Sequence, residues 1–322
     1  MNGTVEHEAP RDPGHGPVDF RILGPVEVLD ARTGERAVPS GAKQSALLGA
    51  LAARPGQVLA ADRLVDELWG DAPPASPANA LQAHVARLRR LLPGDGGPGW
   101  ITTRPPGYLL RLGRATTDAQ RFHRLAAEGR AAAAEEPALA VTVLRRALAL
   151  WRGPALEGSV RGALCAAEAD RLEEQRLTAL EVLYEASLRS GPAEPVVFEL
   201  ERLTAEHPVR ERFHDLLMVA LCRAGRPTEA LGAYERACRR LADGLGVGPG
   251  PALRSRMEAI LHRAPLSATE LSVPPAALGA DAALLDLGSE VARLRSRIDV
   301  LTRQQEDLLH RLHLLTGGPT LV

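Results

Sequence analysis

The stretch from Ser40 to Leu112 constrains the fold of this 322-residue chain more than any other part. Two helical patterns, KQSALLGALAARPG and ADRLVDELW, precede a stiff GDAPPA connection and a third helical pattern, PANALQAHVARLRRLL. Two β-prone runs then flank the turn at residues 104–107. Helices in this order followed by a hairpin predict a winged helix-turn-helix, in which one helix enters the major groove of DNA.

The starts of these helices are marked by residues that can accept an unpaired backbone amide. We expect Ser40 to cap the first helix and Asp62 to cap the second. Ser76 before Pro77 begins the third, because proline is tolerated at the first helical position. Ahead of the helices, residues 20–30 alternate apolar and polar side chains, which predicts a strand pair or a bent strand.

The third helix has two different faces when each residue is rotated by about 100°. Its apolar face carries Leu81, Val85, Leu88 and Leu92. The opposite face carries Asn79, Ala83, Ala86, Arg87 and Arg90, with Gln82 and Arg89 on one flank. Alanines allow close approach to the groove floor, while glutamine and arginine supply groups that distinguish base edges. Taken alone, the arginines are more typical of a plain solvated surface.

The hairpin strengthens the DNA-binding interpretation. Its two β-prone runs, 101–103 and 108–110, place Arg104 at an exposed tip. An arginine there can contact phosphate or enter a minor groove. Between residues 76 and 114 the chain carries six arginines against the single acid Asp95, although the net charge of the whole chain is −1. Positive charge is therefore concentrated on the surface expected to meet DNA.

A family resemblance adds to this interpretation. The segment ADRLVDELWGDAPPASPANALQAHVARLRRLL, together with RPPGYLL, closely resembles the DNA-binding part of the SARP (AfsR-type) regulators, which activate antibiotic biosynthesis clusters, and the order of elements is similar to the OmpR-type winged helix. Together with the helical faces, the resemblance gives an expected set of DNA-contacting residues: Asn79, Gln82, His84, Arg87, Arg89, Arg90, Thr103, Arg104 and Tyr108. It also implies that a loop approaches RNA polymerase, formed by Gly70, Asp71, Ala72, Pro73 and Pro74.

The following part of the chain is a series of amphipathic stretches separated by proline or glycine. The expected helices are 118–134, 137–151, 163–191, 193–208, 210–225 and 226–246. The spacing of Ala230, Tyr234 and Ala237 reproduces part of the tetratricopeptide (TPR) pattern, in which small residues let paired helices nest. Residues 205–256 resemble the bacterial transcriptional activation domain of SARP regulators. A helical stack that only buries its apolar faces is the simpler alternative.

Catalytic and metal-binding classes have little support in the sequence. Lys43, the only lysine, is not preceded by GxxxxG, so the phosphate-binding Walker loop is absent. The pairs His207/His214 and His310/His313 lack further ligands at metal spacing and predict solvated helix histidines. The three widely spaced cysteines predict small buried thiols. We therefore expect no catalytic residue, no metal and no cofactor.

The C-terminal part predicts a coiled coil. After a Pro/Ala/Ser linker at 264–280, apolar residues recur at alternating steps of three and four along residues 281–316. The seam includes Val291, Leu294, Ile298, Leu301, Gln305 and Leu308. This stripe favours a homodimer; packing on the chain's own second domain is the alternative.

These patterns predict a mainly α protein. We expect a disordered leader at 1–18, a winged helix with a small β-sheet and wing at 19–114, and a TPR-like activation domain at 115–263, before the linker and the coiled-coil helix. No apolar signal or spanning run is present, which favours a cytoplasmic protein without a membrane partner. The expected function is activation from tandem repeats in double-stranded DNA by recruiting RNA polymerase holoenzyme, with a helical interaction scaffold or a promoter-occluding repressor as alternatives.

Overall fold

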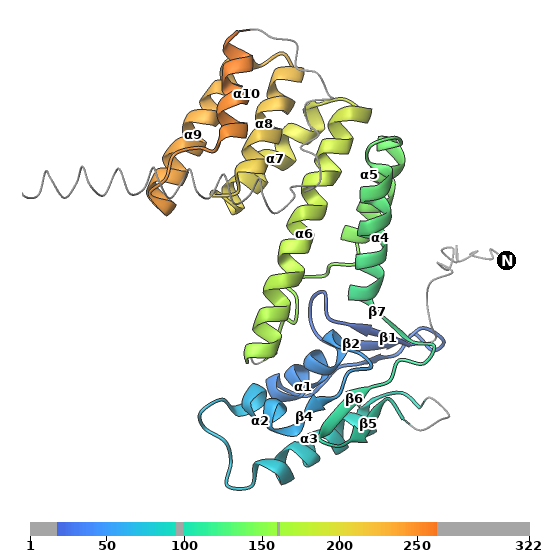
Figure 1. Ribbon diagram of the computed structural model, residues 1–322. Coiled ribbons are helices and arrows are strands. Elements are labelled where there is room, and N and C mark those ends of the chain that lie inside the picture. Colours follow the sequence, from blue (N-terminus) through green and yellow to red (C-terminus); the bar gives the residue numbers. More distant parts are fainter. Residues whose placement is uncertain (1–17, 95–98, 160–161, 263–322) are drawn as a thin grey trace, which may run out of the picture. The chain divides into compact units, whose positions relative to one another are not determined.

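A computed structural model describes residues 18–94, 99–159 and 162–262 of the chain (Figure 1). The expected leader up to residue 17, the linker, the coiled-coil seam and the His310/His313 pair lie outside the described residues. Among the described helices, none has the length and apolar character that a membrane span requires.

The N-terminal part of the fold is a small sheet with the strand order β3-β2-β1-β7. Strand β1 (Val18–Arg21) pairs antiparallel with β2 (Glu27–Asp30), and β2 pairs with β3 (Arg36–Ala37). The expected strand pair is thus confirmed. Strand β7 (Thr116–Thr117) was not predicted; it lies parallel to β1, just before the helical part begins.

Three helices follow this sheet and confirm the helix-turn-helix prediction. They are α1 (Ala42–Ala53), α2 (Ala61–Trp69) and α3 (Pro77–Leu91). Each of the three packs on the other two. Nearly the whole length of α1 is buried, from Gln44 to Ala52. Besides α2 and α3, it packs on α6 and β6.

The caps of these helices differ from the sequence prediction in two cases. Helix α1 begins after Gly41, whose φ of 87° suits glycine, and not after Ser40. Helix α2 begins after Ala60; Asp62 lies in the first turn, where its carboxylate favours the positive end of the helix dipole. Helix α3 begins after Ser76 as predicted, although the Ser76 side chain makes no capping hydrogen bond.

The wing is the hairpin of a second sheet with the order β4-β6-β5. Strands β5 (Ile101–Arg104) and β6 (Gly107–Leu110) form the predicted hairpin, and the unpredicted two-residue strand β4 (Leu59–Ala60) pairs with β6. A Cβ at Gly107 would lie 1.8 Å from the carbonyl oxygen of Leu59. Only glycine therefore permits this approach of β6 to β4.

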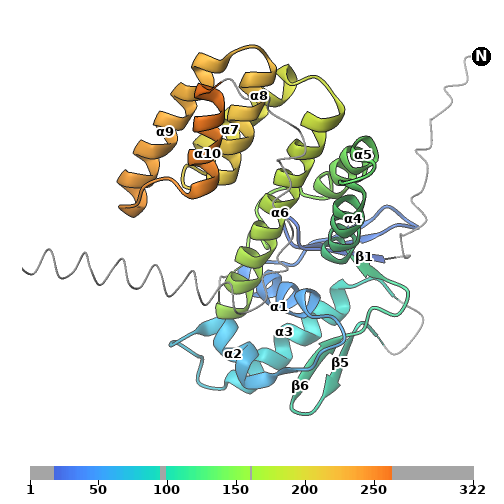
Figure 2. The same cartoon turned by 45° about the horizontal axis from the view of Figure 1, so that its top comes forward.

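The rest of the described chain is helical (Figure 2). The helices are α4 (Asp118–Ala132), α5 (Pro137–Leu148), α6 (Ala163–Ser190), α7 (Glu194–Glu206), α8 (Glu211–Arg223), α9 (Pro227–Leu245) and α10 (Pro251–Leu261). All but α10 were expected. Consecutive helices pack as neighbours, and small residues sit at the contacts, as at Gly129, where a Cβ would lie 2.6 Å from Leu144. The arrangement is TPR-like.

One hydrophobic core runs from the first sheet into the helical part. Its members extend from Val18 through the winged helix to Ala186 on α6. At Gly49 of α1 a Cβ would lie 2.6 Å from Leu156, which follows α5. The winged helix and helices α4–α6 are therefore packed as one body.

In the helical part, the burial of several side chains differs from the sequence prediction. His214 was expected to be solvated, but it is only 4% exposed, and its Nε2 lies 3.0 Å from the Pro208 carbonyl oxygen. Burial lowers the pKa of this imidazole. Cys165 is buried as expected, whereas Cys222 and Cys238 are half-buried; all three thiols are free.

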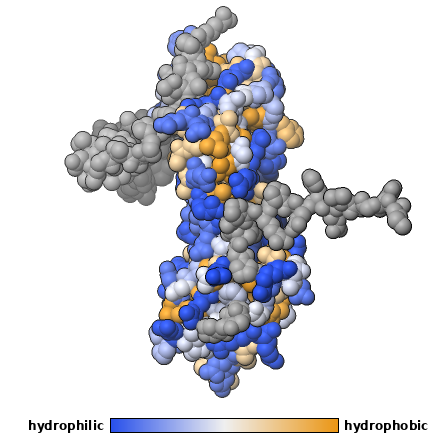
Figure 3. Space-filling model, turned by 90° about the vertical axis from the view of Figure 1, so that its right-hand side faces the viewer, coloured by the Kyte–Doolittle hydropathy of each residue, from blue (hydrophilic) through white to orange (hydrophobic). Residues whose placement is uncertain are grey.

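The surface of the helical part also carries exposed hydrophobic side chains. Phe198 on α7, Val209 and Leu245 are among them. On the face displayed in Figure 3, hydrophobic patches alternate with hydrophilic ones.

Candidate nucleic-acid interface

Helix α3 presents one buried and one exposed face. The predicted apolar face is confirmed, because Leu81, Val85, Leu88 and Leu92 are at most 7% exposed. The side chains that point to solvent are Asn79, Gln82, Ala83, Ala86, Arg87, Arg89 and Arg90. Because the leucine face packs on α1 and α2, the polar face is held outward along the length of the helix.

Arg89 joins α3 to the wing. Its Nε donates to the carbonyl oxygen of Ile101 at 2.9 Å, and its Nη2 donates to Thr103 Oγ1 at 2.9 Å. Figure 2 shows the β5–β6 hairpin beside α3. Arg89 and Thr103 therefore fix the position of the wing relative to the helix, a role that the sequence did not indicate.

His84 faces the neighbouring helix rather than open solvent. The ring is half-buried and meets Trp69 of α2 edge to face, with ring centroids 5.7 Å apart. Its Nδ1 is buried without a hydrogen-bond partner among the described residues. Burial lowers the pKa of His84, and the positive charges of Arg87 and Lys43 lower it further.

Of the wing residues that were predicted to contact DNA, two are exposed and one is buried. Thr103 and Arg104 are exposed, and Arg104 ends β5 opposite Gly107, at the tip of the hairpin as predicted. Tyr108 is only 8% exposed and pairs with Leu59 of β4. Since Tyr108 belongs to the core of the wing sheet, we leave it out of the proposed DNA contacts.

In the part of the chain that the structure describes, the exposed arginines of this surface have no carboxylate partner. Among the described residues, Arg87, Arg90 and Arg104 form no ion pair, and Arg90 makes only a 3.3 Å hydrogen bond to the Ala86 carbonyl oxygen. In the described ranges, no group of His, Cys, Asp and Glu side chains is arranged to hold a metal ion. The surface is therefore suited to a polyanion.

The loop between α2 and α3 lies beside this surface. Gly70 to Pro73 are exposed and Pro74 is half-buried. Gly70 ends α2 with a φ of 53°, a left-handed conformation that favours glycine. The loop for which the family resemblance implies a polymerase contact is thus accessible to a protein partner.

Glu67, which the sequence analysis missed, links α2 to the helical part. This residue is 2% exposed, and its carboxylate accepts hydrogen bonds from the backbone amides of Leu164 at 2.7 Å and Cys165 at 3.0 Å. These amides lie at the N-terminus of α6, which has no side-chain cap of its own. The sequence carried a signal for this role: Glu67 follows the buried Leu64 by one helical turn, so this acid lies on the face of α2 that points into the protein.

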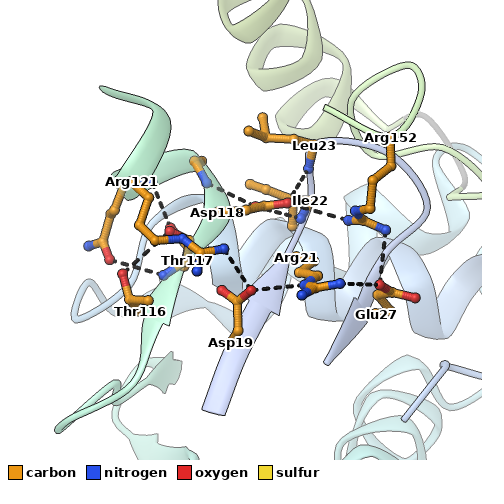
Figure 4. A network of polar contacts seen from close by, with 12 residues as sticks. Asp19, Arg21, Ile22, Leu23, Glu27, Thr116, Thr117, Asp118, Arg121 and Arg152 are labelled. Carbon is orange, nitrogen blue, oxygen red and sulfur yellow. Dashed lines mark hydrogen bonds and ion pairs between the residues drawn. The ribbon is translucent and has the colours of Figure 1, made fainter. Parts of the chain in front are cut away.

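A second link joins β1 to α4 through Asp118 (Figure 4). Its Oδ1 accepts from the Ile22 amide at 2.8 Å, and its Oδ2 accepts from the Leu23 amide at 2.9 Å. Arg152, which follows α5, reaches the same carboxylate at 3.3 Å. Burial nevertheless raises the pKa of Asp118 to about 6.

Asp19 of β1 is a second buried acid of this link. Its Oδ2 accepts from Arg21 Nε at 2.8 Å and from Arg121 Nη2 of α4 at 2.7 Å. Arg21 and Arg152 both contact Glu27, at 3.2 and 3.1 Å. The network pairs acids and arginines from β1, β2, α4 and the segment after α5, and it holds the start of the helical part against the sheet (Figure 4).

Comparison with known proteins supports both parts of the fold. Residues 35–110 match the family model "transcriptional regulatory protein, C terminal", and residues 117–261 match the model "bacterial transcriptional activator domain". The first match covers the three helices and the wing, and the second covers α4 to α10.

Individual relatives match across both parts. Transcriptional regulator RedD of Streptomyces coelicolor is 42% identical over 266 residues, which are 81% of this chain and 74% of the relative. Regulatory protein AfsR of the same organism is 40% identical over 263 residues, 81% of this chain but only 26% of the longer relative. The solved structure of Mycobacterium tuberculosis EmbR in complex with a low-affinity phosphopeptide has a TM-score of 0.74 at 35% identity, covering 80% of this chain and 68% of that one.

Proposed function

Because this chain belongs to the SARP family of transcriptional regulators, with an OmpR-type winged helix and a bacterial transcriptional activator domain, we propose that it binds double-stranded DNA through α3 and the wing. One observation carries the proposal. The exposed face of α3 bears arginines that form no ion pair with any described residue, and Arg89 holds the wing beside that face.

In the proposed complex α3 lies in the major groove. Arg87, Arg90 and Gln82 read base edges, since arginine can bind guanine and glutamine can bind adenine with two hydrogen bonds each. Arg104 contacts a phosphate or a minor groove from the tip of the wing. Asn79, near the start of α3, is exposed on the same face and adds a further donor and acceptor.

The proposed outcome of binding is activation. Two copies occupy tandem repeats near a promoter, and the loop from Gly70 to Pro74 contacts RNA polymerase holoenzyme. The exposure of this loop next to α3 supports the contact. Family membership supports a secondary-metabolite gene cluster as the target, since SARP regulators activate antibiotic biosynthesis clusters.

DNA binding is tested by fluorescence anisotropy with promoter fragments from the neighbouring genes. Replacing Arg87 or Arg90 by alanine removes a base contact and should cost about 1–3 kcal/mol on the preferred site, which corresponds to a Kd roughly 5- to 150-fold weaker. Arg239→Ala is the matched control, because Arg239 is an exposed arginine on α9. Full affinity in both alanine variants contradicts the proposal.

Activation is tested separately by in vitro transcription with purified holoenzyme. The protein should increase transcript from the bound promoter. Asp71→Ala should keep its DNA affinity and lose part of that increase, because Asp71 is exposed in the loop. If the unaltered protein decreases the amount of transcript, it acts instead as a repressor that occludes the promoter.

A further inference from the structure

Three helices bring together a lysine, a tryptophan and a histidine on one side of α3. Lys43 of α1 places its Nζ 5.1 Å from the ring centroid of Trp69 on α2. Trp69 in turn meets His84 of α3, with ring centroids 5.7 Å apart. Lys43 is half-buried, since the aromatic ring lies under its charged end.

Within the described part of the chain, this cluster carries positive charge without a compensating acid. Lys43 has no carboxylate partner among the described residues, and its charged end lies over the Trp69 ring. The charges of Lys43 and Arg87 both lower the pKa of His84, and no carboxylate acts on His84 in the opposite direction. Such an arrangement favours an anion from outside the chain.

The position of the cluster suggests which anion. His84 and Arg89 are five residues apart, so they project about 140° apart around α3. Arg89 lies on the side of α3 that faces the wing, because it donates hydrogen bonds to Ile101 and Thr103. Lys43 therefore lies on the side of α3 away from the wing. A helix of about 10–12 Å diameter fills a major groove of about 12 Å, so groups on its two sides meet the backbones of different strands.

We propose that Lys43 binds a backbone phosphate of the DNA strand that the wing does not contact. Trp69 acts as a positioning residue, because its ring holds the ammonium group next to α3. The contact carries no sequence information and anchors α3 from its second side. The inference rests on the proposed DNA binding and extends it from α3 and the wing to α1.

The first experiment measures affinity against salt for the full chain on the operator and on a random duplex. Lys43→Gln should weaken binding to both duplexes by the same factor, roughly 3- to 10-fold, and reduce the slope of log K against log salt by about one. Lys43→Arg should restore the slope, because it restores the charge. Arg239→Gln is the control.

A purely structural role for Lys43 predicts a different result. If the lysine only supports Trp69, Lys43→Gln lowers the unfolding temperature and leaves the salt slope unchanged. That outcome overturns the proposal. Trp69→Leu provides a further test: it should reduce the salt slope only partly, since the lysine charge remains but loses its support.

The second experiment uses the fact that Lys43 is the only lysine of the chain. Reductive methylation with ¹³C-formaldehyde keeps the positive charge and labels just this side chain and the N-terminal amino group. The Lys43 signal should shift when either duplex is added, and the terminal signal serves as an internal reference. If the protein binds the operator while the Lys43 signal and the salt slope stay unchanged, only this inference fails. If it binds no duplex, the proposed function fails with it.

Discussion

The arginines at the α3 surface and those at the junction of β1 with α4 have opposite environments. At the junction, Arg121 is 4% exposed and bonded to Asp19, which is 0% exposed. On α3, Arg87 and Arg90 are exposed and have no carboxylate partner among the described residues. The two sets of arginines differ in whether a described carboxylate lies close enough to form an ion pair. A paired, buried arginine holds the fold, and an unpaired, exposed one is available to a polyanion.

This comparison predicts that the two regions respond to substitution in opposite ways. Changes at the junction should lower the free energy of unfolding and leave the DNA affinity of the folded protein intact. Changes on the α3 surface should do the reverse. Four substitutions test this separation.

Asp19→Ala should have the largest effect. It leaves Arg121 buried without a charge partner, since Asp19 is the one carboxylate that contacts it in the described structure. Removing one partner of a buried pair typically costs about 3–5 kcal/mol of unfolding free energy. Urea unfolding followed by circular dichroism measures it. A loss below about 1 kcal/mol contradicts the assigned role, and Arg87→Ala, which should unfold like the unaltered protein, is the control.

Asp118 should make the junction sensitive to pH. Its pKa is raised from 3.8 to about 6, so the native state binds the proton more tightly than the unfolded state. The resulting stabilisation is fully present below about pH 4 and is lost as the pH rises through 6, a change of about 3 kcal/mol. Asp118→Asn lacks this titration. Urea unfolding at several pH values should show the unaltered protein losing stability relative to the variant; parallel profiles count against the pKa shift.

Glu67→Ala should have an intermediate effect. It removes the acceptor for two amides at the start of α6, bonded at 2.7 and 3.0 Å. We expect a loss of about 2 kcal/mol in unfolding free energy. Glu67→Gln keeps one acceptor oxygen, so its free energy of unfolding should lie between those of Glu67→Ala and of the unaltered protein. If Glu67→Ala weakens DNA binding without lowering stability, the separation between the regions fails at this point.

Arg104→Ala should have the smallest effect and affect DNA binding alone. The side chain is exposed at the hairpin tip, so stability should change by no more than about 0.5 kcal/mol. Affinity for any duplex should fall a few-fold, and the salt slope should decrease by about one. Anisotropy titrations at several salt concentrations measure both. A loss confined to the operator assigns Arg104 to base reading instead.

The features that sequence predicted well are those encoded locally. The leucine face of α3 follows from the spacing of Leu81, Val85 and Leu88, and all three are at most 1% exposed. The hairpin follows from a turn between two β-prone runs. Helix α10 had a similar local signal, since Leu253 and Ile260 are buried seven residues apart after Pro251, and it was overlooked.

The features that sequence could not predict depend on residues far apart in the chain. Asp118 bonds to amides 95 and 96 residues away, and Glu67 bonds to amides 97 and 98 residues away. No spacing rule relates such positions. The burial of Tyr108 similarly depends on β4, a strand of two residues whose pairing with β6 is set by the whole wing sheet.

Strand β7 has a consequence for any attempt to divide this protein. It pairs with Asp19 and Phe20 along the outer side of β1. A protein ended at residue 114 would lack β7 and leave the β1 backbone unsatisfied along that edge, which is a template for strand addition between molecules. The isolated winged helix should therefore self-associate, whereas one extended through α4 should stay monomeric. The last strand of the N-terminal sheet lies where the match to the activator domain begins, so a winged helix cut at residue 114 lacks part of its own sheet.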